Sequence, residues 1–229
     1  MKVLIFSDIH SNFDALKTLI NRESYDKAIF LGDIVDYGPE PAETLDLVFQ
    51  EADYIVMGNH DYAVAENGDC RCAAEMHDLS EFTREFITKK FLSAGDISRL
   101  TGLKHQSEIE IDGRKMLITH ASPNNNLFGY LFSTEAEMIW KNANYRKFDY
   151  IMVGHTHFPM LYRGKIVNPG SSGQPRDGNW MPMYALLDTQ NDELVFKRFR
   201  YDNARTISKL SDILRDHQDH LNSLKKFYL

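Results

Sequence analysis

The sequence predicts an α/β fold with a parallel sheet at its centre. Three short and continuous apolar runs, at residues 3–7, 27–31 and 54–57, have the length and composition of buried strands. Between them, residues 12–21 and 42–50 carry apolar side chains at helical spacing. This alternation of strands and helices predicts right-handed crossovers, because a helix must carry the chain back to the start of the next parallel strand.

The remainder of the chain is predicted to add one insertion, further strands and a terminal helix. Residues 63–104 are mostly polar with helical periodicity, which predicts a small helical insertion that acts as a lid or packs as an extension of the core. We expect all 229 residues to form one domain. The later elements are a hairpin at 107–111 and 115–119, a helix at 133–142, a strand at 150–154, a hairpin-like pair at 184–187 and 193–201, and a final helix at about 203–227.

Charge and composition exclude several classes of protein. The chain has 26 Lys and Arg against 33 Asp and Glu, a net charge of −7, whereas proteins that bind duplex nucleic acid usually present a basic face. No apolar stretch approaches the ~20 residues that cross a bilayer, and the first six residues are too short for a signal peptide. Cys70 and Cys72 are too close in sequence for an unstrained disulfide, and we interpret them as ordinary loop cysteines. We expect a cytoplasmic protein whose oligomeric state the sequence does not indicate.

Acidic, amide and imidazole side chains follow the predicted strands at the points where the strands end. In open α/β sheets this edge binds ligands. Burying so many unpaired polar groups would cost free energy that divalent cations remove, and oxygen and nitrogen donors fit Mn, Fe, Zn, Co or Ni. The donors exceed what one ion needs, so two ions sharing a bridging carboxylate fit better. The residues are Asp8, His10, Asp33, Asn59, His60, Asp61, His120, His155 and His157.

These residues form five ordered blocks that resemble the calcineurin-like metallophosphoesterase family. The blocks are Asp8-Ile9-His10, Gly32-Asp33, Gly58-Asn59-His60-Asp61, His120 and Gly154-His155-Thr156-His157. They span residues 8–157, about two-thirds of the chain. The resemblance implies two facing mixed β-sheets flanked by helices, a four-layer α/β/β/α sandwich, and the late hairpins can supply the second sheet.

The resemblance also implies a role for each side chain. His60 would donate a proton to the leaving oxygen, and Asp61 would orient it. A hydroxide bridging two metal ions, with manganese the first choice, would attack phosphorus in line. The implied ligands are Asp8, His10 and His157 for one ion, Asn59, His120 and His155 for the other, and Asp33 between them.

The substrate is indicated by fewer residues. The segment Gly32–Pro39 resembles the family's Gly-Asp-x-Val-Asp-Arg-Gly pattern, but Tyr37 replaces the arginine that grips phosphate in protein phosphatases and symmetrical dinucleoside polyphosphate hydrolases. This favours the small prokaryotic phosphodiesterase branch. Tyr37 would stack on a base or pack beside the turn, and Arg176 would meet a phosphate or lie on the surface.

We therefore expect a metal-dependent phosphodiesterase that acts on a small substrate, such as a nucleotide or a dinucleoside polyphosphate. Two alternatives remain open. A phosphomonoesterase or a nuclease would use the same core, although the acidic balance disfavours long nucleic acids. A catalytically inactive scaffold is disfavoured, because the chain keeps both the metal ligands and the proton donor.

Overall fold

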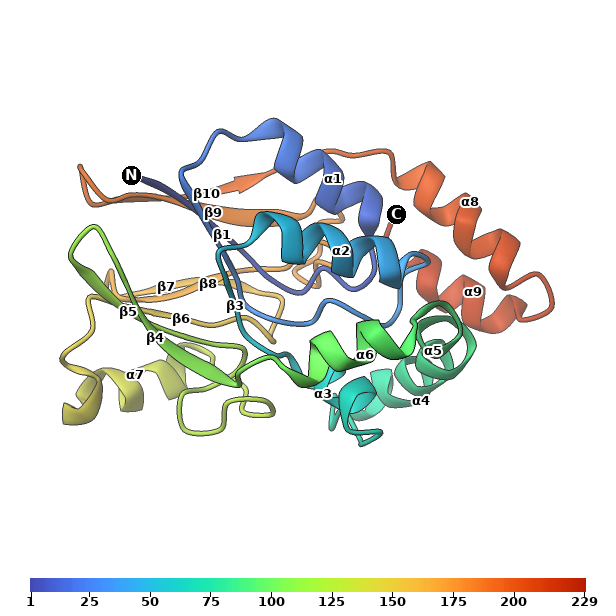
Figure 1. The fold of residues 1–229 in the computed structure, drawn as a ribbon, viewed down its shortest axis with the longest axis horizontal. Coiled ribbons are helices and arrows are strands. Elements are labelled where there is room, and N and C mark those ends of the chain that lie inside the picture. Colours follow the sequence, from blue (N-terminus) through green and yellow to red (C-terminus); the bar gives the residue numbers. More distant parts are fainter.

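Two five-stranded mixed sheets pack face to face, with helices on their outer sides (Figure 1). The computed structural model describes every residue from Met1 to Leu229. This is the four-layer α/β/β/α arrangement that the family resemblance implies. In spatial order, the first sheet contains β10 (Glu193–Arg198), β9 (Met183–Asp188), β1 (Lys2–Phe6), β2 (Lys27–Phe30) and β3 (Tyr54–Ile55). The second contains β4 (Gln106–Ile111), β5 (Arg114–Thr119), β6 (Tyr150–Met152), β8 (Ile166–Pro169) and β7 (Pro159–Tyr162).

Each sheet contains three parallel strands, with antiparallel strands added on one side of the first sheet and on both sides of the second. β1 pairs in parallel with β2, and β2 with β3, as the sequence predicts. β9 runs antiparallel to β1 and pairs in turn with β10. In the second sheet β5, β6 and β8 are parallel, whereas β4 and β7 are antiparallel. The parallel strands therefore direct the loops after β1, β2, β5 and β6 towards a shared edge.

Alternating side chains of β1 build two separate cores. Val3 and Ile5 pack between the sheets together with Met116 of β5. Leu4 and Phe6 point the other way and pack under the helices of the first sheet. Successive side chains of a strand face opposite sides, so a strand that is apolar throughout must be covered on both faces. The continuous apolar run that predicts this strand thus also explains its place between two layers.

Helices cover the outer face of each sheet. The first sheet is covered by α1 (Phe13–Arg22), α2 (Pro41–Glu51) and α8 (Asn203–Ile213), whose buried apolar side chains share one core. The second is covered by α7 (Ser133–Lys141), which is followed by a 3-10 turn (Ala143–Tyr145). The insertion predicted at 63–104 is helical. It begins within α3 (Asn59–Ala65) and contains α4 (Ala74–Thr83), a π-helical turn (Arg84–Thr88), α5 (Lys89–Phe91) and α6 (Ala94–Thr101).

The C-terminal segment forms two helices, α8 and α9 (Gln218–Lys225), and not the single helix predicted over 203–227. The backbone leaves helical geometry at Leu214, with φ −109° and ψ 34°. The turn brings Leu221 and Leu224 into the core, and α9 packs against the insertion, where His220 stacks on Phe82 at 3.6 Å between ring centres. One straight helix would extend about 37 Å and leave these apolar groups in water.

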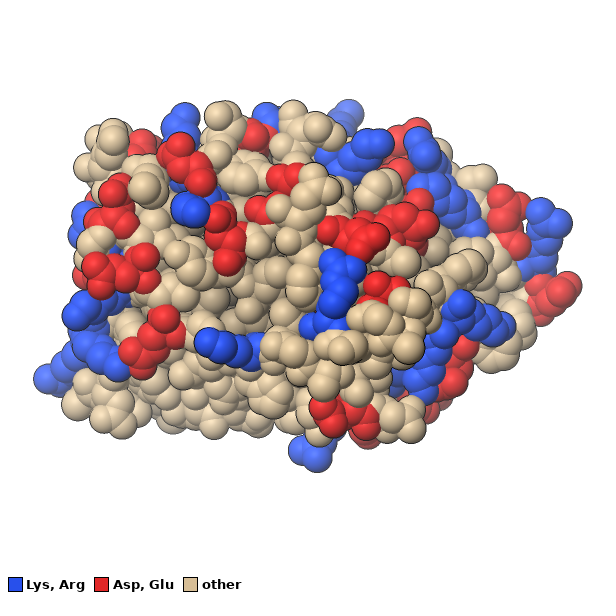
Figure 2. Space-filling model, viewed as in Figure 1, with Lys and Arg blue, Asp and Glu red and all other residues tan.

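The visible surface carries charges of both signs (Figure 2), and no helix of the chain is suited to span a membrane. None of the helices combines the length and the apolar composition that crossing a bilayer requires. On the face drawn in Figure 2, acidic and basic side chains are interspersed over most of the surface. This face therefore lacks the continuous basic surface typical of proteins that bind duplex nucleic acid.

Candidate metal centre

The loops after β1 and β2 carry the first group of predicted site residues. The backbone N–H of Asp8 donates to the carbonyl of Gly32 at 2.9 Å, and that of His10 donates to the carbonyl of Asp33 at 3.1 Å. Asp8, His10 and Asp33 adopt left-handed backbone conformations, with φ of 53°, 48° and 63°. Such conformations are strained for residues other than glycine and persist only where surrounding contacts enforce them. The two loops thus hold each other in the geometry that aims these side chains inwards.

The second sheet supplies the remaining imidazoles. His120 directly follows β5, whereas His155 and His157 lie in the loop after β6. The backbone N–H of His155 donates to both carboxylate oxygens of Asp8 at 3.2 Å, which joins the two sheets across the site. A Cβ atom at Gly154 would overlap the side chains of Ser7 and Asp8 at the end of β1. The close approach of the two loops therefore requires glycine at this position.

One cluster contains Asp8, His10, Asp33 and His157, whose ligand atoms lie within 4.8 Å of one another. His10 and His157 each direct Nδ1 at a backbone carbonyl oxygen. A neutral imidazole has a single N–H, so both Nε2 atoms present lone pairs, and they face each other at 3.3 Å. Two lone pairs and two carboxylates converging at this distance repel unless a cation lies between them. The donor set therefore fits a divalent metal ion.

The second cluster contains Asp33, His120 and His155, and Asn59 joins it. Nε2 of His120 lies 2.9 Å from Oδ1 of Asn59 and 3.3 Å from Oδ2 of Asp33. The amide nitrogen of Asn59 donates to the carbonyl of Cys70 at 2.8 Å, which turns the amide oxygen towards the imidazoles. Oxygen and nitrogen donors again converge on one point, as in the first cluster.

The pKa values indicate a site that lacks positive charge. Burial lowers the pKa of His10 and of His155 to about 3, so both imidazoles are neutral and offer lone pairs. Burial raises the pKa of Asp8 to about 7. Burial disfavours a charged His120, but the charge of Asp33 outweighs it and raises the pKa of His120 to about 9. A proton on His120 thus partly replaces the charge that a bound cation would bring.

His60 lies beside both clusters but outside the two groups of ligand atoms. Its Nδ1 contacts Oδ2 of Asp36 at 2.8 Å, while Nε2 makes no hydrogen bond. The ring packs edge-on against His10 at 5.0 Å and is 3% exposed. Burial disfavours the charged ring, but the charge of Asp33 and the hydrogen bond to Asp36 outweigh burial and raise the pKa of His60. This imidazole therefore favours carrying a proton.

Asp61 does not orient His60, contrary to the sequence-based expectation. Its carboxylate accepts backbone N–H groups of Gly58 at 2.9 Å, Asp33 at 2.9 Å and Ile34 at 2.8 Å. Asp61 stands three residues after the N-cap of α3, and a side chain there reaches back to the cap. It therefore fixes the loop backbones, and Asp36 holds the imidazole.

Asp36 is the site residue that sequence reasoning missed. Asp36 is the second aspartate of the segment that resembles the family's Gly-Asp-x-Val-Asp-Arg-Gly pattern, and this position could have marked it as a site residue. Its buried carboxylate also accepts from Nη2 of Arg84 at 2.7 Å and from the hydroxyl of Thr88 at 3.0 Å. The two residues come from the π-helical turn, so the insertion braces the imidazole of His60 through one carboxylate.

Tyr37 and Arg176 both lie at the site. The Tyr37 ring is fully buried against His10 and His60, at 4.9 and 5.1 Å between ring centres. It packs beside the turn and does not offer a face to a base, although its hydroxyl has no hydrogen-bond partner. The Arg176 guanidinium lies 5.9 Å from that ring, and its buried Nε is also unpartnered.

The Asn168-Pro169-Gly170-Ser171 segment supports the metal-site loops. The amide nitrogen of Asn168 donates to the carbonyl of Gly154 at 2.7 Å. The hydroxyl of Ser171 donates to the carbonyl of Asp8 at 2.7 Å. These buried side chains thereby tie the strained loops of both sheets together, which is more than the plain turn that Asn-Pro-Gly alone predicts.

Comparison with known proteins agrees with this geometry. The calcineurin-like phosphoesterase superfamily domain matches residues 1–192. The chain belongs to this superfamily. A metallophosphoesterase from Sphaerobacter thermophilus has the same fold, with a TM-score of 0.77 and 27% identity over 98% of this chain and 99% of its own. The phosphoesterase is accordingly a phosphoric ester hydrolase of a metal-binding family, and its His and Asp clusters fit metal binding.

Two relatives differ in how much of the phosphoesterase they match. An uncharacterised protein of Methanocaldococcus jannaschii is 31% identical over an alignment of 235 positions, gaps included, that covers 91% of each chain. A symmetrical bis(5'-nucleosyl)-tetraphosphatase of Vibrio cholerae is 28% identical over 123 residues, 51% of this chain and 43% of its own.

Proposed function

We propose that this phosphoesterase uses two divalent metal ions, with manganese the first choice, to hydrolyse a phosphodiester bond in a small nucleotide-type substrate. The observation that carries the two-ion proposal is the position of Asp33. Its Oδ2 lies 3.7 Å from Nε2 of His10 in one cluster and 3.3 Å from Nε2 of His120 in the other. A carboxylate oxygen placed between two donor sets suits a bridging ligand.

Each of the remaining donors belongs to one ion. When bound, the ions would supply a water of lowered pKa and offset the negative charge of the phosphate. The backbone carbonyls that accept from Nδ1 of His10 and His157 orient these rings for ligation, and burial lowers the pKa of both rings and keeps them neutral. The proposed ligands are Asp8, His10 and His157 for one ion and Asn59, His120 and His155 for the other, with Asp33 shared.

His60 is proposed to donate the proton that the leaving oxygen requires. Its Nε2 is unoccupied by any protein group, and Asp36 holds Nδ1 at 2.8 Å, so the ring cannot turn away. The neighbouring negative charges raise its pKa against the effect of burial, which keeps the donor protonated. General acids positioned in this way typically accelerate a reaction ~10²–10⁴-fold.

Two unpaired donors beside the first cluster support phosphate binding. The hydroxyl of Tyr37 and Nε of Arg176 are buried and make no hydrogen bond within the protein. Leaving buried donors unpaired costs about 1–3 kcal/mol each, and a phosphate oxygen would remove that cost. We therefore assign both to the non-bridging phosphate oxygens, with the arginine contributing charge as well as a hydrogen bond.

Exposed aromatic rings beside the second cluster support a nucleoside substituent. Tyr130, Phe132 and Phe158 are 38%, 44% and 42% exposed. The ring centre of Tyr130 lies 4.4 Å from that of His155, and Phe132 extends the row at 6.1 Å with its plane only 8° from that of Tyr130. Such faces bind nucleobases by stacking. The dinucleoside polyphosphate named for the Vibrio cholerae relative is a substrate of this kind.

A substrate panel tests the proposal. The protein would be assayed with Mn, Fe, Ni and Zn in parallel on bis-p-nitrophenyl phosphate, p-nitrophenyl phosphate, cyclic nucleotides, diadenosine tetraphosphate and single-stranded DNA. We expect the small diesters and the dinucleoside polyphosphate to be hydrolysed with higher kcat/KM than the monoester and the DNA. Preference for the monoester would contradict the diesterase assignment, and preference for DNA would indicate a nuclease.

The proposed role of His60 has its own test. His60→Ala should retain the wild-type metal content, measured by elemental analysis, and lose ~10²–10⁴-fold in kcat because only the proton donor is removed. His105→Ala is the matched control, since the His105 side chain is exposed and belongs to neither cluster. Loss of metal from the His60 variant would mean that this imidazole is a ligand.

A further inference from the structure

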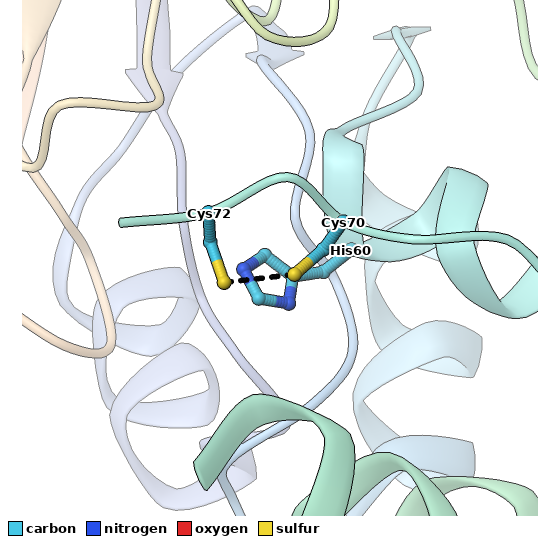
Figure 3. Close-up of side chains that lie close together, drawn as sticks. All are labelled: His60, Cys70 and Cys72. Atoms are coloured by element: carbon cyan, nitrogen blue, oxygen red, sulfur yellow. Dashed lines mark hydrogen bonds between the residues drawn. The ribbon is translucent and has the colours of Figure 1, made fainter. Parts of the chain in front are cut away.

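Two thiols and an imidazole meet just before the start of α4. Figure 3 shows the side chains of Cys70 and Cys72 converging on the ring of His60. The two Sγ atoms lie 2.8 Å apart, and one ligand atom from each of the three residues lies within 4.8 Å of the others. Both cysteines are free. The interpretation of this pair as ordinary loop cysteines does not account for the convergence.

The loop that carries the thiols is fixed at several points. The carbonyl of Cys70 accepts from the amide of Asn59 at 2.8 Å, and its Sγ lies 3.2 Å from the hydroxyl of Ser80 on α4. Cys70 is fully buried, whereas Cys72 is partly exposed. The inner thiol is thus held in place, and the outer one gives access from solvent.

The third member of the cluster is an unpaired nitrogen. His60 is 3% exposed, Asp36 occupies its Nδ1, and its Nε2 makes no hydrogen bond. Two cysteine sulfurs with one histidine nitrogen form a donor set that zinc uses, with a fourth position left to water. A tetrahedral ion with Zn–S distances of about 2.3 Å would hold the sulfurs about 3.8 Å apart, so the 2.8 Å pair must open by about 1 Å. The partly exposed side chain of Cys72 can make this movement.

We propose that Cys70, Cys72 and His60 form a separate binding site for a thiophilic divalent cation such as Zn²⁺. The proposed hydrolytic ions have only oxygen and nitrogen donors. Manganese prefers such donors, whereas thiolates select softer ions, so the two kinds of site discriminate between metals. A disulfide would use the sulfurs alone, but the cation also engages the unpaired imidazole nitrogen.

Binding at this site has a consequence for catalysis, which rests on the proposed function. Zinc bound to Nε2 of His60 leaves that nitrogen without a proton for the leaving oxygen. The phosphoesterase would then be inhibited by thiophilic cations while manganese supports its activity. The binding itself does not depend on what the enzyme hydrolyses.

Cobalt spectroscopy tests the site independently of activity. The chain has only two cysteines, so a sulfur-to-cobalt charge-transfer band in the near ultraviolet can arise only from Cys70 and Cys72. We expect the reduced full-length protein to develop this band with Co²⁺ and to lose it when Zn²⁺ is added. The Cys70→Ser/Cys72→Ser variant should show no band. His77→Asn, a change on α4 outside the cluster, should leave the band intact.

His60→Asn tests the third ligand. It should raise the zinc dissociation constant of the thiol site by about tenfold or more, since even second-shell changes at metal sites cost 10–100-fold. An unchanged constant would remove His60 from the site. Absence of the cobalt band in the reduced wild-type protein would overturn the proposal.

A zinc titration of the manganese-loaded enzyme tests the inhibitory role. We expect the wild-type rate to fall ~10²-fold or more, the loss typical of removing a general acid. The Cys70→Ser/Cys72→Ser variant should keep its own zinc-free rate at the same zinc concentration. Equal inhibition of both proteins would place the effect at the hydrolytic ions and refute the inhibitory role. If no substrate is hydrolysed at all, the proposed function fails while the cobalt result still decides the thiol site.

Discussion

For four of the five histidines at the metal centre, the role follows from the partner of Nδ1. His155 differs, because its own Nδ1 faces the second cluster and its Nε2 has no partner. His10, His120 and His157 direct Nδ1 at backbone carbonyl oxygens, which accept a hydrogen bond but bring no net charge. Nε2 is then free to bind a cation. His60 directs the same nitrogen at the carboxylate of Asp36, whose negative charge favours the protonated ring. Metal ligation and proton donation are thus separated by the choice between a carbonyl and a carboxylate.

This separation predicts a pH effect for Asp36→Asn. The variant keeps an oxygen for Nδ1 of His60 but removes a charge that raises the pKa of His60. A proton donor is active below its pKa and inactive above it, so lowering the pKa moves the alkaline limb of the rate profile to lower pH. The measurement is kcat against pH with manganese, beside the wild type. The limb should stay in place for Glu66→Gln, a change at the exposed end of α3. An unmoved limb in Asp36→Asn would assign it to another group.

At the residue scale, the sequence predicted which side chains gather but not every contact between them. The side chains of the seven proposed ligands lie together because each follows a strand of the two sheets, where topology alone brings them to one edge, and their role as ligands stays a proposal. The prediction that Asp61 orients His60 was wrong. Asp61 is adjacent to His60 in sequence, but its position in α3 directs the carboxylate towards the N-cap of that helix. Asp36 reaches the ring only through a left-handed backbone with φ 68°, which no periodicity indicates.

At the scale of elements, the π-helical turn links the insertion to the metal centre. Arg84 and Thr88 come from this turn, and both bind the carboxylate of Asp36. Arg84 is 4% exposed, so its ion pair with Asp36 is buried. The insertion therefore acts first as a brace for the imidazole of His60, and its function as a moving lid stays a prediction.

Arg84→Met should be strongly destabilising. Removing one partner of a buried ion pair leaves the other charge uncompensated, which typically costs ~3–5 kcal/mol. Arg99→Met is the control, because Arg99 is partly exposed and its pairs with Asp46 and Asp96 are of the surface kind, worth about 1 kcal/mol or less. Urea unfolding of the apoprotein would measure both free energies of unfolding. A similar loss in the two variants would mean that the buried pair is dispensable for stability.

Elements with strong local patterns were predicted well, and those set by distant contacts were not. The parallel strands and the hairpin at Asp112-Gly113 follow from apolar runs and turn residues that act locally. The break after Leu214 has no glycine or proline to announce it. The break arises because packing α9 against the core and the insertion stabilises the chain more than continuing α8 would. This is a tertiary effect, which the helical spacing of apolar residues does not indicate.

At the scale of the whole molecule, the metal centre lies where the two sheets meet. Asp8 and Asp33 come from the first sheet, whereas His120, His155 and His157 come from the second. Without a cation, the hydrogen bonds from the His155 amide to Asp8 are direct links between these loops. Bound ions would add several strong bonds across the same boundary, so metal binding and the packing of the sheets are coupled.

This coupling predicts that chelation lowers thermal stability. An ion held only by the folded state at 100 times its dissociation constant adds about 2.7 kcal/mol, and for a chain of this size each kcal/mol shifts Tm by roughly 2–4 °C. Removing manganese with a chelator should therefore lower Tm by roughly 5–10 °C per ion, measured by calorimetry with and without added metal. His60→Ala should show the full shift, because it removes a proton donor and no ligand. Asp33→Asn should lose most of it, because both clusters share that carboxylate. If the Tm of the wild-type protein is the same with and without metal, the two sheets are not joined through bound ions.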